Sequence, residues 1–241
     1  MRIHRGLVRA GQVCVVVLAL AGCSTVVTGS AVPVPGAPAT PRSPGPSSSN
    51  PSAAPPASVP GWQVVLATNA GLAYDVPPDW KVATPDTVIG FTDQQGKQVV
   101  GMSDSASYKV GYCQGHSGSS RGGVGVNSTN TTDPGQAASD SAQKWANAGY
   151  ISEVDVPPTI TAGTPQPVTV AGVAGMLVRD TLTVAQHSPC DPPTAEVDVL
   201  ALPLSAPNTG CDQLILYADQ GTPDSAPAQE LQQIIGSLRA A

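Results

Sequence analysis

The sequence predicts an α+β domain in which an antiparallel β-sheet is flanked by helices. All nine aromatic residues of the 241-residue chain fall between Trp62 and Tyr217, so the globular part is assigned to residues 61–241. Within it, short segments of alternating apolar and polar residues, bounded by turn residues, predict a series of strands. Two segments with helical periodicity interrupt and end that series, which is the order typical of an α+β fold.

The first half of this region is predicted to form β-hairpins. Strands are expected over 62–67 and 72–76, joined by a turn at Asn69-Ala70-Gly71, and over 88–92 and 97–102 around a Gln-Gln-Gly turn. A further short strand is expected over 108–113. Residues 114–132 are rich in Gly, Ser and Asn and predict a loop.

Two helices follow from their capping signals and apolar faces. Asp133 is the expected N-cap with Pro134 at the first helical position, and Gly149 is expected to end this helix at about Ala148. Its buried face would hold Ala138, Ala142 and Trp145. The later strands are expected over 168–170, 175–184, 196–202 and 213–218. A closing helix over 224–239 would bury Leu231, Ile234, Ile235 and Leu238.

The N-terminus has the pattern of an export signal. Basic residues precede a short apolar run over 13–21, which is far below the roughly 20 residues that a spanning helix needs. Leu20-Ala21-Gly22-Cys23 resembles the bacterial lipobox, so residues 1–22 are expected to be a lipoprotein signal peptide and Cys23 the lipidated residue. The alternative is an ordinary secretory signal followed by a chance cysteine. The predicted location is the outer face of the cell membrane, in the cell envelope.

A tether is predicted between the lipidated cysteine and the domain. Residues 23–60 are rich in Pro, Ser and Ala, contain no aromatic residue and carry one charge, Arg42. Such a segment cannot bury enough apolar surface to offset its ordering entropy, so a disordered linker is expected.

Three cysteines remain for the domain once Cys14 is removed with the signal and Cys23 is acylated: Cys113, Cys190 and Cys211. Export favours disulfide formation. A hairpin between 196–202 and 213–218 would place Cys190 at its open end and Cys211 at its closed end. At about 3.3 Å per residue they would lie well over 10 Å apart, beyond the reach of a disulfide. Cys113 is therefore left to pair with one of the other two.

Several short motifs carry a resemblance to a known family. These are Tyr74-Asp75-Val76-Pro77-Pro78-Asp79-Trp80, Gly111-Tyr112-Cys113-Gln114-Gly115, Cys190-Asp191-Pro192-Pro193 and Ile234-Ile235-Gly236-Ser237-Leu238. Over about 64–240 the chain resembles the PsbP-like domains of actinobacterial, mycobacterial-type secreted lipoproteins of unknown function. The resemblance implies an α/β/α sandwich without a shared catalytic site, and it favours the pairing of Cys113 with Cys190.

Few residues suggest chemistry. Cys113, His116, His187 and Cys190 have the residue types of a tetrahedral zinc site, although exported thiolates usually oxidise first. Gly115-His116-Ser117-Gly118-Ser119 approaches a nucleophile elbow but lacks its last Gly and its strand–helix context. Asp75, Asp79 and Asp86 near Trp80 are interpreted as a solvated turn, and Asp219 as a turn cap.

Composition and charge limit the classes of protein to which this chain can belong. The net charge of −6 and the absence of a nucleic-acid motif exclude a basic nucleic-acid binder. No catalytic residue and no cofactor is assigned. The favoured function is a monomeric, non-enzymatic envelope lipoprotein that binds a protein, glycan or lipid. The alternative is an extracytoplasmic hydrolase or zinc-binding protein that uses the 113–121 loop and His187.

Overall fold

A computed structural model describes residues 55–85, 87–93, 95–152 and 155–241. The predicted signal peptide, Cys23, most of the predicted linker and Asp86 lie outside these residues. The last part of the predicted linker is included, and it contacts the domain. The backbone amides of Ser58 and Val59 donate hydrogen bonds to the carboxylate of Asp75. Residues 55–60 therefore pack with the domain that follows them.

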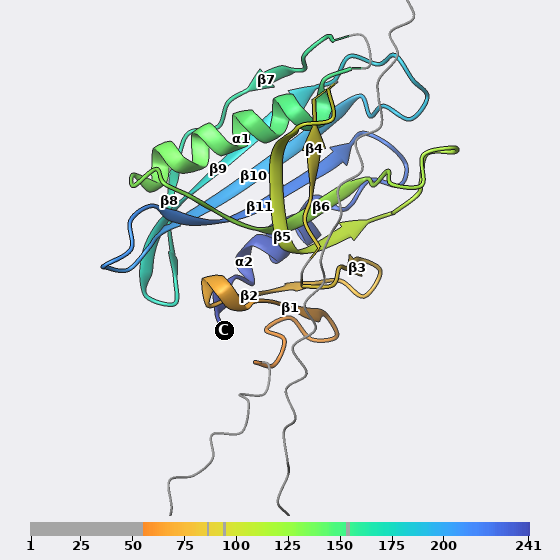
Figure 1. Cartoon of the computed structure of the whole chain (residues 1–241). Helices are drawn as coiled ribbons and strands as arrows, with labels where there is room; N and C mark the ends of the chain where they lie inside the picture. The colour runs from red at the N-terminus through yellow and green to blue at the C-terminus, as the bar shows by residue number, and fades with distance from the viewer. Residues whose placement is uncertain (1–54, 86, 94, 153–154) are drawn as a thin grey trace, which may run out of the picture. The chain divides into compact units, whose positions relative to one another are not determined.

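The described chain is an α+β domain built on antiparallel sheets, as predicted (Figure 1). Within the described residues the larger sheet has nine strands. In spatial order they are β3 (Lys81–Val82), β5 (Gln98–Tyr108), β6 (Gly122–Thr129), β11 (Cys211–Gln220), β10 (Thr194–Pro203), β9 (Val173–Thr183) and β7 (Thr159–Thr161), with β4 (Ile89–Thr92) paired to β5 and β8 (Gln166–Val170) paired to β9. The smaller sheet joins β1 (Gln63–Ala67), β2 (Leu72–Val76) and β12 (Arg239–Ala240).

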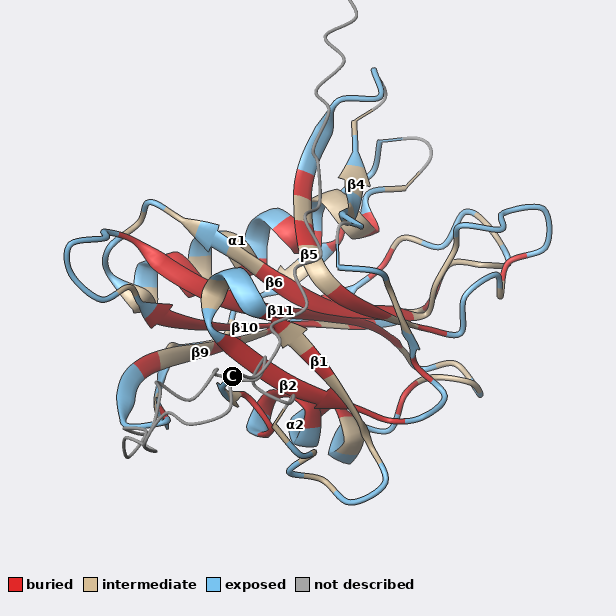
Figure 2. Cartoon of the chain, turned by 60° about the horizontal axis from the view of Figure 1, so that its bottom comes forward, coloured by how far each residue is buried: buried red, intermediate tan, exposed pale blue. Residues whose placement is uncertain are grey.

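Helices and the small sheet cover the two faces of the large sheet. The helix α1 (Pro134–Tyr150) packs on one face against β9, β10 and β11. The helix α2 (Ala228–Gly236) and the β1–β2–β12 sheet cover the other face. Successive side chains of β10 point to opposite faces of the sheet. Val197 and Val199 pack in the core beneath α1, whereas Leu200 packs in the core beneath α2. Figure 2 shows the central strands buried between these layers. Neither helix has the length and hydropathy to span a membrane, and no other described helix does.

Strand β6 corrects the prediction of a loop over 114–132. It lies in the middle of the large sheet, paired with β5 and β11. Its glycines made the segment look like a loop, but they serve close packing. A Cβ on Gly123 would lie 2.7 Å from the ring of Tyr217, and one on Gly125 would lie 2.8 Å from Met102 Cγ. Glycine here lets large neighbouring side chains lie directly on the strand.

Strand β5 also differs from the prediction. It is one strand from Gln98 to Tyr108, so the separate strand expected over 108–113 does not form. Asp104 has φ 46°, and the register with β6 shifts between Ser103 and Ala106, which marks a β-bulge. The Tyr74 hydroxyl donates to the Asp104 carbonyl at 2.6 Å and holds this bulge in place. A bulge bends a strand, and the β4–β5 hairpin accordingly stands across the end of α1 (Figure 1).

The start of α1 was predicted correctly, whereas the end of α1 and both ends of the closing helix were not. Asp133 caps α1, as expected, by accepting a hydrogen bond from the Gln136 amide at 2.7 Å. The helix does not end at Gly149 but continues to Tyr150. A Cβ on Gly149 would lie 2.7 Å from the Phe91 ring, so this glycine provides space for the hairpin. The closing helix is shorter than the predicted 224–239, because residues 239–240 leave it to pair with β2.

Candidate functional site

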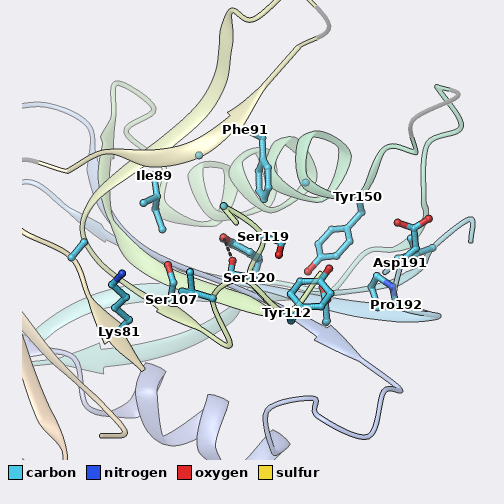
Figure 3. Close-up of a pocket in the computed structure, with 18 of the residues that line it drawn as sticks. Lys81, Ile89, Phe91, Ser107, Tyr112, Ser119, Ser120, Tyr150, Asp191 and Pro192 are labelled. Atoms are coloured by element: carbon cyan, nitrogen blue, oxygen red, sulfur yellow. Dashed lines mark hydrogen bonds between the residues drawn. The ribbon is translucent and has the colours of Figure 1, made fainter. Parts of the chain in front are cut away.

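A pocket of about 640 Å³ opens where the β4–β5 hairpin, the C-terminal end of α1 and two loops meet (Figure 3). The loops are residues 109–121 and 184–193, and β11 contributes to the pocket lining. Phe91 on the hairpin packs against Trp145 of α1 and Tyr217 of β11. Its ring centroid lies 5.8 Å from that of Trp145 and 5.2 Å from that of Tyr217. The bulge in β5 therefore positions one wall of the pocket.

A disulfide fastens the two loops to each other. Cys113 and Cys190 are bonded with Cα atoms 5.6 Å apart, which is the pairing chosen from the sequence. The Tyr112 hydroxyl donates to the Cys190 carbonyl at 3.1 Å. The Arg121 guanidinium lies over the Tyr112 ring, 3.9 Å from its centroid, and donates to the same carbonyl at 3.3 Å. These contacts hold Tyr112 in place as a second wall of the pocket.

Asp219 supplies a buried carboxylate to the pocket lining. It lies within β11, so its interpretation as a turn cap was wrong. Arg121 Nη1 is 3.1 Å from Asp219 Oδ2, and the guanidinium also pairs with Asp224 at 3.2 Å. Burial raises the pKa of Asp219 to about 6 even though the hydrogen bond from Arg121 acts in the opposite direction.

Tyr150, the last residue of α1, lines the same pocket. Its side chain extends toward Tyr112 in Figure 3. Tyr150 is 6 % exposed, and its buried hydroxyl interacts with the Asp219 carboxylate without making a close hydrogen bond to any described residue. Burial, together with the nearby charge of Asp219, raises the pKa of this phenol well above its ordinary value. A buried hydroxyl without a close hydrogen bond is unfavourable, so this group is available to a ligand.

The remaining lining mixes hydroxyl and apolar groups. Ser107, Ser119 and Ser120 contribute hydroxyls, and Ser120 Oγ lies 3.3 Å from the Tyr217 hydroxyl. Ile89, Val184 and Pro192 contribute apolar surface. A concave site with apolar walls and a few placed polar groups is the usual form of a small-molecule site.

The zinc hypothesis does not fit this arrangement. Both of its sulfur atoms, on Cys113 and Cys190, are used in the disulfide. His116 and His187 are exposed on the two linked loops. Among the described residues, no group of three or more His, Cys, Asp and Glu side chains is placed to hold a metal ion. Disulfide sulfurs are not thiolates, so the four-residue set has lost two of its ligands.

The serine hypothesis also lacks its geometry. Ser117 lies in an exposed turn of the 109–121 loop, with neither a strand directly before it nor a helix after it. No histidine side chain of the described residues hydrogen-bonds to a serine hydroxyl. Nothing in this loop therefore activates the Ser117 hydroxyl as a nucleophile.

The acidic turn near Trp80 was misinterpreted at one of its positions. Asp75 is fully buried rather than solvated. Its carboxylate accepts hydrogen bonds from Ser58 and Val59 and lies 2.9 Å from Arg239 Nη2. Asp79 is exposed. Asp75 is thus a structural residue that joins the first and last described segments of the domain.

The pocket residues that sequence reasoning missed are Arg121, Tyr150 and Asp219. Arg121 and Asp219 are 98 residues apart, and no local motif connects them. Tyr150 follows a glycine that resembles a helix stop, which concealed its position in the last turn of α1. The one available signal was Tyr112, because it directly precedes a cysteine of the disulfide.

Comparison with known proteins gives one family. A family model described as "Domain of unknown function (DUF8017)" matches residues 55–241, which is more than three quarters of the chain. A comparison with curated proteins finds no match. The matched region begins at the first described residue and includes the whole pocket. The chain therefore belongs to the DUF8017 family.

Proposed function

We propose that this protein is a lipid-anchored, extracytoplasmic binding protein that holds a small ligand in the pocket beside Tyr150. In this proposal the lipid is on Cys23 and residues 24–54 form a spacer. The domain that follows is a PsbP-like α/β/α sandwich with no enzymatic activity. The buried Tyr150 hydroxyl, which makes no close hydrogen bond within the described residues and lies in a preformed pocket, is the observation that supports ligand binding most strongly.

Several features support the anchor. The order of basic residues, apolar run and Leu20-Ala21-Gly22-Cys23 is that of a lipoprotein signal. An acyl anchor with two or more chains holds a protein stably at a membrane, whereas one chain alone is marginal. The disulfide between Cys113 and Cys190 agrees with an oxidising location.

The anchor is tested by metabolic labelling with a fatty-acid analogue followed by membrane fractionation. Cys23→Ala is expected to abolish the label and release the protein from membranes. Cys14→Ala is the matched control, since that cysteine precedes the cleavage site, and it is expected to keep both. Retention of the Cys23→Ala protein in the membrane fraction would refute the anchor.

The absence of a chemical mechanism in the pocket supports binding rather than catalysis. The pocket-lining carboxylates are Asp191 and Asp219. The first accepts hydrogen bonds from the His187 and Ser188 amides of its own loop, at 2.9 and 2.8 Å, and the second is paired with Arg121. Both carboxylates thus have structural partners within the protein.

The binding role is tested on protein released gently from membranes, by native mass spectrometry. We expect a bound small molecule in the unmodified protein. Ala185→Trp, which adds a large ring at a pocket-lining position, is expected to exclude it. Thr169→Trp, on exposed β8 away from the pocket, is expected to leave it bound. Equal occupancy in both variants would show that the pocket is not the binding site.

A further inference from the structure

We infer that the ligand of this pocket is uncharged and rich in hydroxyl groups, with the size and chemistry of one or two neutral sugar rings. This inference rests on the proposed binding function and specifies its ligand. It follows from three properties of the lining: how its charges are paired, where its unused hydrogen-bonding groups lie, and how polar and apolar surfaces alternate.

Charge pairing disfavours an ionic ligand of either sign. An anion placed against β11 would meet the buried Asp219 carboxylate. A cation there would compete with Arg121, which is 3.1 Å from Asp219 and 3.2 Å from Asp224. Asp191 is engaged by two backbone amides of its own loop. Lys81 lies exposed at the mouth, where water and salt screen its charge. Because an unpaired buried charge is costly, the inner part of the pocket suits a neutral ligand.

The unused polar groups are hydroxyls and one carboxylate oxygen. The Tyr150 hydroxyl can donate one hydrogen bond and accept two. It interacts with the Asp219 carboxylate but makes no close hydrogen bond within the described residues, so most of this capacity is free. Arg121 contacts Oδ2 of Asp219, which leaves Oδ1 as an acceptor. Ser120 shares a hydrogen bond with Tyr217, and Ser107 lies nearby in the pocket lining. A sugar hydroxyl both donates and accepts, so it can satisfy the phenol and the carboxylate together.

Aromatic and aliphatic side chains suit the other surface of a sugar. Phe91 and Tyr112 come from opposite walls and, with Ile89, face the space between them (Figure 3). Pyranose rings carry C–H groups on their faces and hydroxyls on their edges, so they need both kinds of wall. A purely apolar chain would leave the buried Tyr150 hydroxyl without a close hydrogen bond. At about 640 Å³ the pocket is within the range that encloses small ligands and has room for two rings.

The test uses residues 23–241 with Cys23→Ala, exported so that the disulfide forms. Calorimetric titrations are made with maltose, cellobiose and N,N′-diacetylchitobiose as neutral probes, and with glucuronic acid and glucosamine as charged ones. We expect at least one neutral disaccharide to bind and both charged sugars to bind at least tenfold more weakly. Tyr150→Phe, which removes one oxygen atom, is expected to weaken the neutral sugar about tenfold. Tyr108→Phe, a tyrosine outside the pocket that packs against Trp80, is expected to have no effect.

The possible outcomes distinguish a failure of the sugar inference from a failure of the proposed binding function. Equal binding of charged and neutral sugars, or an unchanged affinity in Tyr150→Phe, would overturn the inference. If no sugar binds but the neutral apolar probe N-phenyl-1-naphthylamine binds and Ala185→Trp excludes it, the ligand class is wrong and the binding function stands. If neither class of probe binds and no molecule co-purifies with the protein, both proposals fail.

Discussion

Replacing both Cys113 and Cys190 by Ala removes the disulfide that links the two loops beside the pocket. The size of the expected effect on stability follows from the separation of the two residues in the chain. The two residues are 77 positions apart in the chain. In the chain-entropy model, a closed loop of that length lowers the free energy of folding by about 4.5 kcal/mol at 25 °C. With a urea m value of about 2 kcal/mol/M, the unfolding midpoint should fall by about 2 M.

The assay is urea denaturation followed by tryptophan fluorescence, at equal protein concentration for each variant. Cys211→Ala is the matched control, because Cys211 is a buried free thiol and its replacement leaves the loops joined. We expect that control to lose about 1 kcal/mol, as for the loss of a small buried group. The reasoning is refuted if the double variant loses no more than the control, or if a non-reducing peptide map connects Cys113 to Cys211.

Three further outcomes follow from the packing and the charges. Gly123→Ala should destabilise the domain by about 1–3 kcal/mol, because its Cβ would lie 2.7 Å from the Tyr217 ring. Gly118→Ala should change the stability little, since no atom lies within 4 Å of the added Cβ. Equal losses of stability in chemical denaturation would contradict this prediction. Asp75→Asn should cost about 2 kcal/mol, since it removes the buried charge that pairs with the partly exposed Arg239 and accepts hydrogen bonds from the Ser58 and Val59 amides. A melting temperature within 1–2 °C of the parent would count against it. Burial raises the pKa of Asp219 from 3.8 to about 6, so its contribution to stability is complete below about pH 4 and is lost as the pH rises through about 6. Unfolding measured from pH 4 to 7 should therefore show a decline of roughly 2–3 kcal/mol that Asp219→Asn removes, and identical slopes in the two proteins would disprove the assignment.

Local sequence patterns predicted the elements whose side chains alternate or repeat regularly. The β1–β2 hairpin, the capped start of α1 and the β10–β11 hairpin all lie where the patterns placed them. In each case the information lies in the alternation within one strand, in a turn sequence or in a capping residue, all of which are local patterns. The hairpin register then sufficed to exclude a bond between Cys190 and Cys211, because Cys211 pairs with Pro203 at the closed end.

The errors arose where a residue serves a distant neighbour. Gly123 and Gly125 resemble loop residues, yet they make room for Tyr217 and Met102 in a central strand. Gly149 resembles a helix stop, yet it makes room for Phe91. Asp75 resembles a solvated turn residue, yet it is buried and pairs with Arg239 near the end of the chain. Local propensity does not carry this information, since the partners are tens of residues away.

By itself the sequence determined the class of the fold and the place in the chain of most of its strands, because each depends on short-range composition or periodicity. Export and lipidation at Cys23 are predictions from the same kind of local pattern. Only the tertiary structure decided the pocket. It required a bulge in β5 to turn Phe91 across α1, a disulfide to hold Tyr112, and a helix that ends with a buried Tyr150 hydroxyl beside Asp219. These groups come from segments far apart in the chain, so their proximity is a property of packing and not of any local pattern.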